Sequence, residues 1–139
     1  MFFIQNYLKK RIIKSLMNKY SEELISFIEK LKESSKLIIV EGQRDKKALE
    51  QLGINKIVTL NKEPLFKIAE NISKEHKDVI ILTDLDKKGK QLYGKLNSSL
   101  QRLGLRVDNR FRNFLLKKTK LRQIEGIINY LEKIKNQQP

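Results

Sequence analysis

The sequence contains no cysteine and no tryptophan, and only one histidine, two prolines and six glycines among its 139 residues. Without cysteine the chain forms no disulfide and no thiolate zinc site, and the single His76 has no partner at metal-ligand spacing. The lack of cysteine also fits a cytoplasmic protein, which is the localisation we expect. Because so few glycines and prolines leave little room for flexible linkers, we expect one globular domain with terminal helical additions.

Long hydrophobic runs are also missing. No uninterrupted apolar run exceeds four residues, as in Leu37–Val40 and Val79–Leu82, whereas a membrane-spanning helix needs roughly 20. The apolar residues near the N-terminus are interrupted by Lys9, Lys10 and Arg11, which is not the pattern of a signal peptide. We therefore expect no association with a membrane.

Basic residues are in excess, and they are unevenly distributed. The formal net charge is +14, yet residues 37–86 contain 8 Lys and Arg against 9 Asp and Glu, whereas residues 87–139 contain 14 against 3. A basic chain with a neutral, acid-containing middle suits a protein that binds a polyanion on one surface and a metal on another. The alternative is that the lysines reflect an AT-rich genome or a thermophilic host. We favour nucleic acid as the partner.

The middle of the chain alternates short apolar runs with amphipathic stretches. The pattern predicts strands at residues 37–40, 56–60, 79–83 and 105–107, and helices at residues 46–52, 64–72 and 89–103. Strands that alternate with helices indicate crossover connections and a mainly parallel sheet. We therefore predict an α/β, Rossmann-like domain with four to five strands and helices on both faces of the sheet.

The two ends differ from this middle part. We divide the chain into an N-terminal helical extension (1–34), the α/β domain (35–117) and a C-terminal basic helix (118–139) that packs on the domain or extends it. The extension is expected to form two helices, or one helix that bends near Tyr20, with Ser21 as an N-cap. Met17 is an alternative start. The extension can pack on its own sheet, on a second copy in a homodimer, or on a partner protein.

Three acidic residues follow two of the predicted strands. Glu41 follows residues 37–40, and Asp84 and Asp86 end the stretch VIILTDLD. Ligands of open parallel sheets bind beyond the carboxyl ends of the strands, and alternating side chains put positions 84 and 86 on one side. Oxygen ligands of this kind suit Mg²⁺ or Mn²⁺. The alternative is that these aspartates only cap a helix or make a turn.

Two other ligand-binding motifs are excluded by single residues. The stretch DLDKKG begins like a calcium-binding EF-hand loop, but Lys88 and Lys95 occupy positions five and twelve, where that loop needs oxygen ligands. A GxxxxGK[ST] loop for phosphate binding is absent from the sequence, so a nucleotide-hydrolysing motor is not expected.

The acidic residues lie in motifs that resemble a known family. IIVEGQRD (Ile38–Asp45) and ILTDLDKKG (Ile81–Gly89) resemble the two signature motifs of the Toprim domain. That domain is shared by bacterial-type primases, topoisomerases, certain nucleases and the nuclease that matures the smallest bacterial ribosomal RNA. The resemblance covers about residues 36–116. The segment VDNRFRNFLLKK (Val107–Lys118) further resembles small stand-alone Toprim proteins of archaea and some bacteria.

The resemblance implies a Toprim fold and roles for individual residues. Glu41, Asp84 and Asp86 would form the catalytic and metal-binding set, with Glu41 as general acid/base or metal-shaping carboxylate and the two aspartates as ligands of Mg²⁺. The implied supporting residues are Gly42, Asp45 and Gly89. The turn Thr59–Lys62 lacks the glycine often found there in primases and maturation nucleases. All four tyrosines lie on predicted helices, so we do not expect topoisomerase chemistry.

Basic residues flank these motifs and continue into the C-terminal third. The residues that we expect to bind nucleic acid are Arg44, Lys87, Lys88, Lys90, Arg110, Arg112, Lys117 and Lys118. Phe111 and Phe114 lie between them and could stack on unpaired bases, but their spacing favours a place in the core. Glu125 could cap the last helix or lie near the metal, and we favour the cap.

These observations predict a Mg²⁺-dependent enzyme acting on nucleic-acid phosphodiesters. A nuclease that processes structured RNA is favoured, with RNA preferred over DNA as substrate. The alternative is a non-catalytic nucleic-acid-binding module associated with a ribosome, a primase or an RNA-processing complex. Nucleotidyl transfer, as in primases, is less favoured because the sequence has no accessory zinc-binding or helicase-contacting segment.

Overall fold

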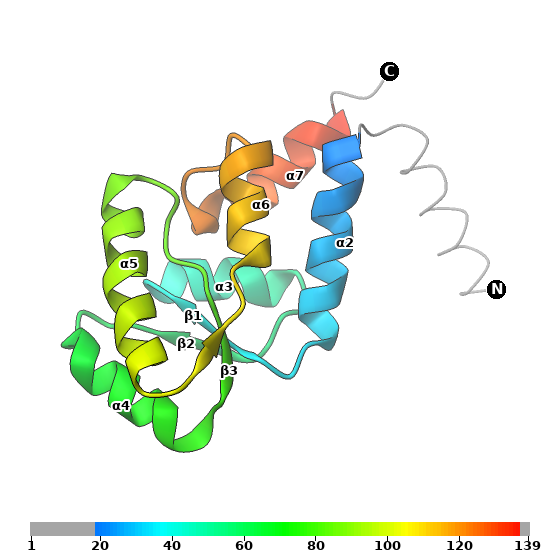
Figure 1. Cartoon of the computed structure of the whole chain (residues 1–139). Helices are drawn as coiled ribbons and strands as arrows, with labels where there is room; N and C mark the ends of the chain where they lie inside the picture. Colours follow the sequence, from blue (N-terminus) through cyan, green and yellow to red (C-terminus); the bar gives the residue numbers. More distant parts are fainter. Residues whose placement is uncertain (1–18, 137–139) are drawn as a thin grey trace.

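The computed structural model of the chain describes residues 19–136 (Figure 1). The elements in chain order are α2 (Lys19–Glu33), β1 (Leu37–Val40), α3 (Gln43–Gln51), β2 (Ile57–Thr59), α4 (Leu65–Glu75), β3 (Asp78–Ile81), α5 (Lys87–Arg102), β4 (Arg106–Val107), α6 (Arg110–Lys118), the short 3₁₀ helix η1 (Ile124–Gly126) and α7 (Ile127–Asn136). Every strand and helix predicted between residues 37 and 107 is present, with boundaries that differ by a few residues. The predicted α/β fold is confirmed.

The four strands form one parallel sheet in the order β2-β1-β3-β4. β1 lies between β2 and β3, with Ile38 opposite both Ile57 and Ile80. All strands run in the same direction, so their carboxyl ends meet at one edge of the sheet. The chain leaving β1 at Glu41 and the chain leaving β3 toward Asp84 are therefore neighbours.

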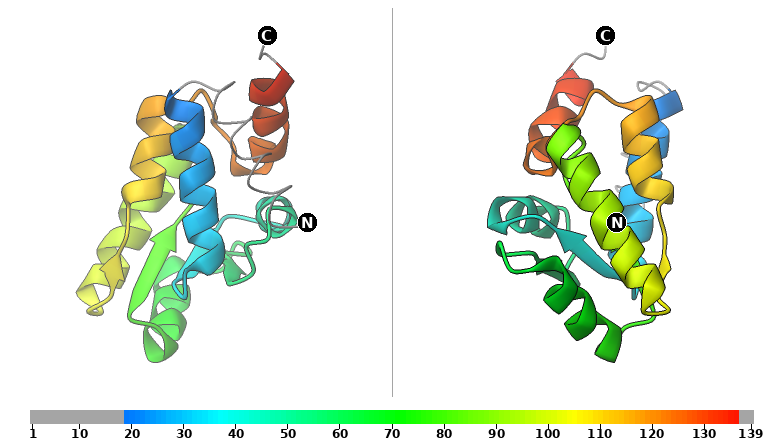
Figure 2. Two further views of the ribbon diagram at one scale, coloured as in Figure 1. Left: turned by 90° about the vertical axis from the view of Figure 1, so that its right-hand side faces the viewer. Right: turned by 60° about the vertical axis from the view of Figure 1, so that its left-hand side comes forward.

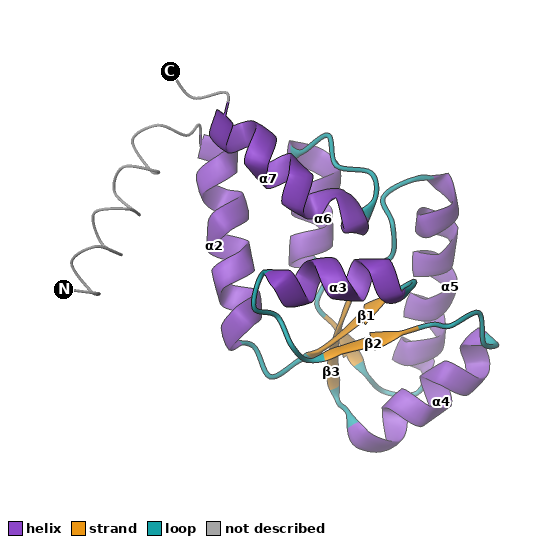
Figure 3. Cartoon of the chain, turned by 180° about the vertical axis from the view of Figure 1, so that it is seen from behind, coloured by secondary structure: helices purple, strands orange, loops and turns teal. Residues whose placement is uncertain are grey.

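The sheet separates two hydrophobic cores. Successive strand residues point to opposite faces, so Ile38 and Val40 pack in one core and Leu37 and Ile39 in the other. The first core is covered by α2, α3, α6 and the start of α7, and the second by α4 and α5. Figure 3 shows α3 across the face of β1 and β2, and the right view of Figure 2 shows α4 and α5 together on the near side.

Helix α2 belongs to the first core. It lies beside α6, as Figure 2 shows, and the ring centre of Phe27 lies 5.4 Å from that of Phe111 and 5.1 Å from that of Phe114. The expectation that Phe111 and Phe114 face the core is confirmed, because both are buried. Helix α2 already includes Ser21, so the predicted N-cap at this residue is wrong.

The described residues do not decide the remaining predictions for the two ends of the chain. The first predicted helix and the alternative start at Met17 lie outside the described residues. The domain boundaries at residues 34 and 117 stay predictions. Among residues 19–136, no helix is long and apolar enough to cross a membrane.

A tight junction connects β3 to α5 and forms part of the acidic edge. Asp86 is the N-cap of α5, and its Oδ1 accepts a hydrogen bond of 2.8 Å from the Gly89 N–H. The buried Thr83 hydroxyl donates to the Gly89 carbonyl at 2.7 Å. A Cβ atom at Gly89 would lie 1.9 Å from the backbone oxygen of Asp84. Gly89 is therefore required because the backbone after β3 passes directly over the first turn of α5.

We predict that Gly89→Ala destabilises the protein by several kcal/mol, on the order of 3 or more, because neither backbone segment can move away without breaking this junction. Gly94→Ala is the matched control: it lies in the same helix, and a Cβ there would meet nothing within 4 Å. It should stabilise α5 by about 0.5–1 kcal/mol through helix propensity. Urea denaturation of both variants measures the effects, and equal stabilities would contradict the packing role of Gly89.

Candidate functional site

Glu41 and Asp84 meet at the carboxyl edge of the sheet. Glu41 directly follows β1, and Asp84 lies three residues beyond the end of β3. The backbone N–H of Asp84 donates a hydrogen bond of 2.7 Å to Oε2 of Glu41. Two acids that lie 43 residues apart in the sequence are therefore held side by side by the parallel pairing of β1 with β3.

The segment between α6 and α7, which includes η1, closes this edge from the other side. The Ile124 N–H donates to Oδ1 of Asp84 at 2.9 Å, and the Leu85 N–H donates to the carbonyl of Arg122 at 2.7 Å. The Asp84 carboxylate is thus oriented by a chain segment that follows it by 40 residues. Sequence patterns gave no sign of this contact.

Each of the three predicted ligands uses one carboxylate oxygen to fix its position. The second oxygen of Glu41, Asp84 and Asp86 has no hydrogen-bond partner among residues 19–136. Within the same residues none of these acids forms a salt bridge with a lysine or arginine. Asp86 does cap a helix, as the alternative interpretation of the Asp-x-Asp pair proposed, but its second oxygen is still available to bind a metal.

Asp45 has a different role. It is buried, its Oδ2 accepts from the Gly42 N–H at 3.1 Å, and its Oδ1 accepts from the Glu125 N–H at 3.1 Å. Burial, and then the charge of Glu41, raise the pKa of this carboxyl. Because both oxygens are occupied, Asp45 positions the start of α3 and the η1 segment. Gly42 has open space where a Cβ would lie, so no packing contact requires a glycine there.

The acids at this edge repel one another. Burial, together with the negative charges of Asp45, Glu41 and Asp86, raises the pKa of Asp84 from 3.8 to about 6, although the hydrogen bond from Ile124 acts in the opposite direction. Burial is the largest cause of this shift, and the like charges of the neighbouring acids add to it.

Arg112 lies behind the acids, inside the protein. Its side chain is 1% exposed, its Nη1 donates to the Thr83 carbonyl, and its Nη2 donates to the Asp84 carbonyl at 2.9 Å. The guanidinium also stacks over Tyr93, 4.8 Å from the ring centre. Burial lowers the pKa of Arg112, while Tyr93 and the nearby acids act to raise it. Helix α6 thus fixes the backbone that carries Asp84.

A cleft of about 430 Å³ opens at the acidic edge. The acids that line it are Glu41, Asp45, Glu63, Asp84 and Glu125. Glu125 therefore lies beside the other acids as well as in the first turn of η1, and its expected role as a helix cap stays a prediction. The basic residues along the cleft are Arg44, Lys62 and Lys88. Arg44 and Lys88 are among the residues expected to bind nucleic acid, whereas Lys62 is not.

Comparison with known proteins identifies the family. The Toprim domain model matches residues 35–109. The chain belongs to the Toprim family. This Toprim protein is 34% identical to a UPF0292 protein of Methanocaldococcus jannaschii over 122 residues, covering 84% of this chain and 95% of the relative. It is 42% identical to a UPF0292 protein of Thermococcus sibiricus, covering 76% and 83%.

A solved structure supports the same assignment. A protein from Aquifex aeolicus superposes with a TM-score of 0.69 at 35% sequence identity, covering 74% of this chain and 96% of that one. Toprim domains typically bind Mg²⁺, and membership indicates a metal-binding module related to nucleic acids.

The donor set of this Toprim site fits such a cation in its chemistry. The free atoms are carboxylate oxygens, which Mg²⁺ prefers, and Mg²⁺ often takes only one or two carboxylates and fills its other positions with water and phosphate. Among residues 19–136, however, no group of three or more His, Cys, Asp or Glu side chains is arranged to hold an ion. The acids therefore share the Toprim edge without forming a ready three-ligand cage.

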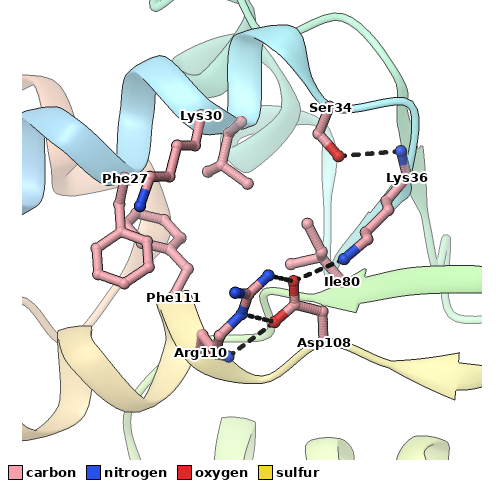
Figure 4. Close-up of a pocket in the computed structure, with 9 residues that line it drawn as sticks. Phe27, Lys30, Ser34, Lys36, Ile80, Asp108, Arg110 and Phe111 are labelled. Atoms are coloured by element: carbon pink, nitrogen blue, oxygen red, sulfur yellow. Dashed lines mark hydrogen bonds and ion pairs between the residues drawn. The ribbon is translucent and has the colours of Figure 1, made fainter.

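The predicted nucleic-acid contacts are not one surface. The prediction for Arg112 is wrong, because this side chain is buried against backbone carbonyls. Arg110 points to Asp108 at the other end of the sheet, where Lys36 also donates to Asp108 (Figure 4). Lys87 and Lys90 are exposed in the first turn of α5, and Lys117 and Lys118 in the last turn of α6. For these exposed lysines, nucleic-acid binding stays a prediction.

We predict that Arg112→Lys destabilises the Toprim domain by about 2–4 kcal/mol, because one ammonium cannot serve two buried carbonyls as a guanidinium does. Chemical denaturation measures the loss. Arg110→Lys is the control and should change stability little, since that side chain is exposed. Similar losses of unfolding free energy in the two variants would show that the buried hydrogen bonds of Arg112 do not stabilise the domain more than the exposed contacts of Arg110.

We further predict that Asp84→Asn stabilises the metal-free protein above about pH 6. The raised pKa means that the folded state binds the proton of Asp84 more tightly, so its contribution to stability is present below pH 3.8 and is lost as pH rises to about 6. Thermal melts from pH 4 to 8 should show a gap that opens in favour of the variant. Mg²⁺ should then stabilise the wild type more than the variant. A gap independent of pH would contradict the repulsion among the acids.

Proposed function

We propose that this Toprim protein is a Mg²⁺-dependent nuclease that cleaves structured RNA. The observation that carries the proposal is the hydrogen bond from the Asp84 N–H to Glu41, which fixes two acids with free oxygens at the mouth of a cleft. Arg44, Lys62 and Lys88 line the same cleft and can contact flanking phosphates. An acidic centre beside basic side chains suits a phosphodiester substrate.

The residues divide the chemistry among them. A bound divalent cation supplies Lewis-acid stabilisation of the phosphodiester and an acidified water. The free oxygens of Asp84 and Asp86 would hold that cation. Glu41 Oε1, the oxygen not bonded to the Asp84 N–H, accepts a proton from the attacking water. As the water oxygen bonds to phosphorus, the bond from phosphorus to the leaving sugar oxygen breaks, and that oxygen takes a proton from solvent water. Lys88 and Arg44 neutralise the phosphates on either side, which is the main requirement of phosphoryl transfer.

As part of this proposal, the protein is related to primases and to the nuclease that matures the smallest bacterial ribosomal RNA. This relationship favours RNA over DNA as the substrate. Tyr93 lies near the second motif, but its ring supports Arg112 and packs against the second core. That arrangement supports a packing role and argues against a tyrosine nucleophile.

A second candidate is a nucleic-acid-binding module without catalysis, associated with a ribosome, a primase or an RNA-processing complex. Two observations favour it: no three-ligand group is formed within residues 19–136, and Asp86 caps α5. In this case the acids bind a metal only for stability, and the lysines provide the affinity.

Cleavage of total cellular RNA and of matched DNA, with Mg²⁺ and with EDTA, separates the two candidates. We expect Mg²⁺-dependent cutting of RNA by the wild type and a loss of at least about 100-fold in Glu41→Gln and in the double variant Asp84→Asn/Asp86→Asn. Asp78→Asn is the control, because this acid lies at the other end of the sheet and pairs with Arg106. Binding by all proteins with cutting by none would leave only the binding module.

A further inference from the structure

One wall of the cleft is apolar. Leu60 after β2, Leu65 at the start of α4 and Leu92 on α5 line it together with Glu41 and Asp84. A surface that served only to hold a phosphate backbone would need charged and polar groups there. Leucines in the lining of a cleft can contact an uncharged, flat part of a ligand.

Leu92 is the most informative of the three. It is half-buried, yet it belongs to neither core cluster of the described residues, whereas Leu60 and Leu65 pack against the second core. Leu92 is therefore the leucine of this lining that neither core cluster includes. Its place in the lining puts its side chain against whatever occupies the cleft.

Lys62 adds a positive charge to the lining of the same cleft, and its backbone conformation is unusual. Asn61 and Lys62 have φ values of 51° and 60°, the left-handed region that glycine adopts without strain. Thr59 Oγ1 donates to Asn61 Oδ1 at 2.6 Å and stabilises the turn. The chain keeps a lysine where glycine would be the relaxed choice, and that lysine lines the cleft.

We propose that the cleft binds one unpaired nucleotide of the strand that is cleaved. This inference rests on the proposed function and names its substrate class. The base lies against Leu92 and Leu65, and its phosphate contacts Lys62 and Lys88. A paired base hides its faces in the helical stack, so only a base in a loop, a bulge or a single strand can reach this wall. The volume of about 430 Å³ lies within the range of about 300–1,000 Å³ typical of small-molecule sites.

The experiment measures binding, so that it does not depend on cleavage. Anisotropy of a fluorescein-labelled 12-nucleotide RNA is followed in Mg²⁺, with every protein carrying Glu41→Gln to keep the strand intact. The same strand is tested alone, as a duplex and as its DNA equivalent. We expect the single strand to bind about tenfold more tightly than the duplex. Equal affinities for strand and duplex would overturn the proposal.

Two variants with matched controls test the named contacts. Leu92→Ala should weaken single-strand binding about fivefold and leave duplex binding unchanged. Leu103→Ala should change neither, because this leucine is 45% exposed at the far end of α5 and lies outside the cleft. Lys62→Gly should weaken binding while thermal stability stays equal or rises, since glycine relaxes the turn. Lys77→Ala, at the opposite end of the sheet, controls for the lost charge.

The results also separate this inference from the proposed function. Mg²⁺-dependent cutting with no effect of Leu92→Ala or Lys62→Gly would remove the nucleotide site and keep the nuclease. Single-strand preference that depends on both residues, in a protein that never cuts, would keep the site and remove the nuclease. If both substitutions only lower the melting temperature, the residues are structural and the nucleotide site is refuted.

Discussion

Negative charge accumulates at one edge of the sheet, and the backbone around that edge is arranged to orient it. Parallel pairing of β1 with β3 brings Glu41 and Asp84 together, and Asp45 and Asp86 lie close enough to raise the pKa of Asp84. No lysine or arginine forms a salt bridge with these acids within residues 19–136. The protein instead directs backbone N–H groups at them, and these partial charges orient the carboxylates without neutralising them.

Arg112 contributes in an indirect way. A guanidinium paired directly with Asp84 would compete with a metal for its oxygens, because such pairs are strong and bidentate. Arg112 contacts the carbonyls of Thr83 and Asp84 from inside the core and leaves the carboxylate free. Its positive charge remains near the acids, whose negative charges act to raise the pKa of Arg112. Rigid support and an available ligand oxygen are thus provided by the same side chain.

Sequence patterns predicted the parts of the protein that depend on local periodicity. LIIV and VIIL indicated buried strands because both faces of a covered parallel sheet are apolar, and acids at strand ends located the edge. Contacts between distant segments left no local signal. Arg112 lies in the charge-rich stretch DNRFRN, which is typical of a surface segment. Its burial left no local signal, because its partners lie 28 and 29 residues away in the sequence. The turn after β2 lacks a glycine in the sequence, and the structure shows that Asn61 and Lys62 adopt the left-handed conformation there.

Helix α6 and the segment that joins it to α7 bear on where this domain ends. The family match ends at residue 109, yet Arg112, Ile124 and Glu125 all hold groups of the acidic edge. The part of the chain that matches the family is therefore shorter than the part that holds the acidic edge in place. An excised 35–109 fragment would retain both signature motifs and lose the scaffolding that aligns them. Grafting this centre onto another protein would require everything through the start of α7.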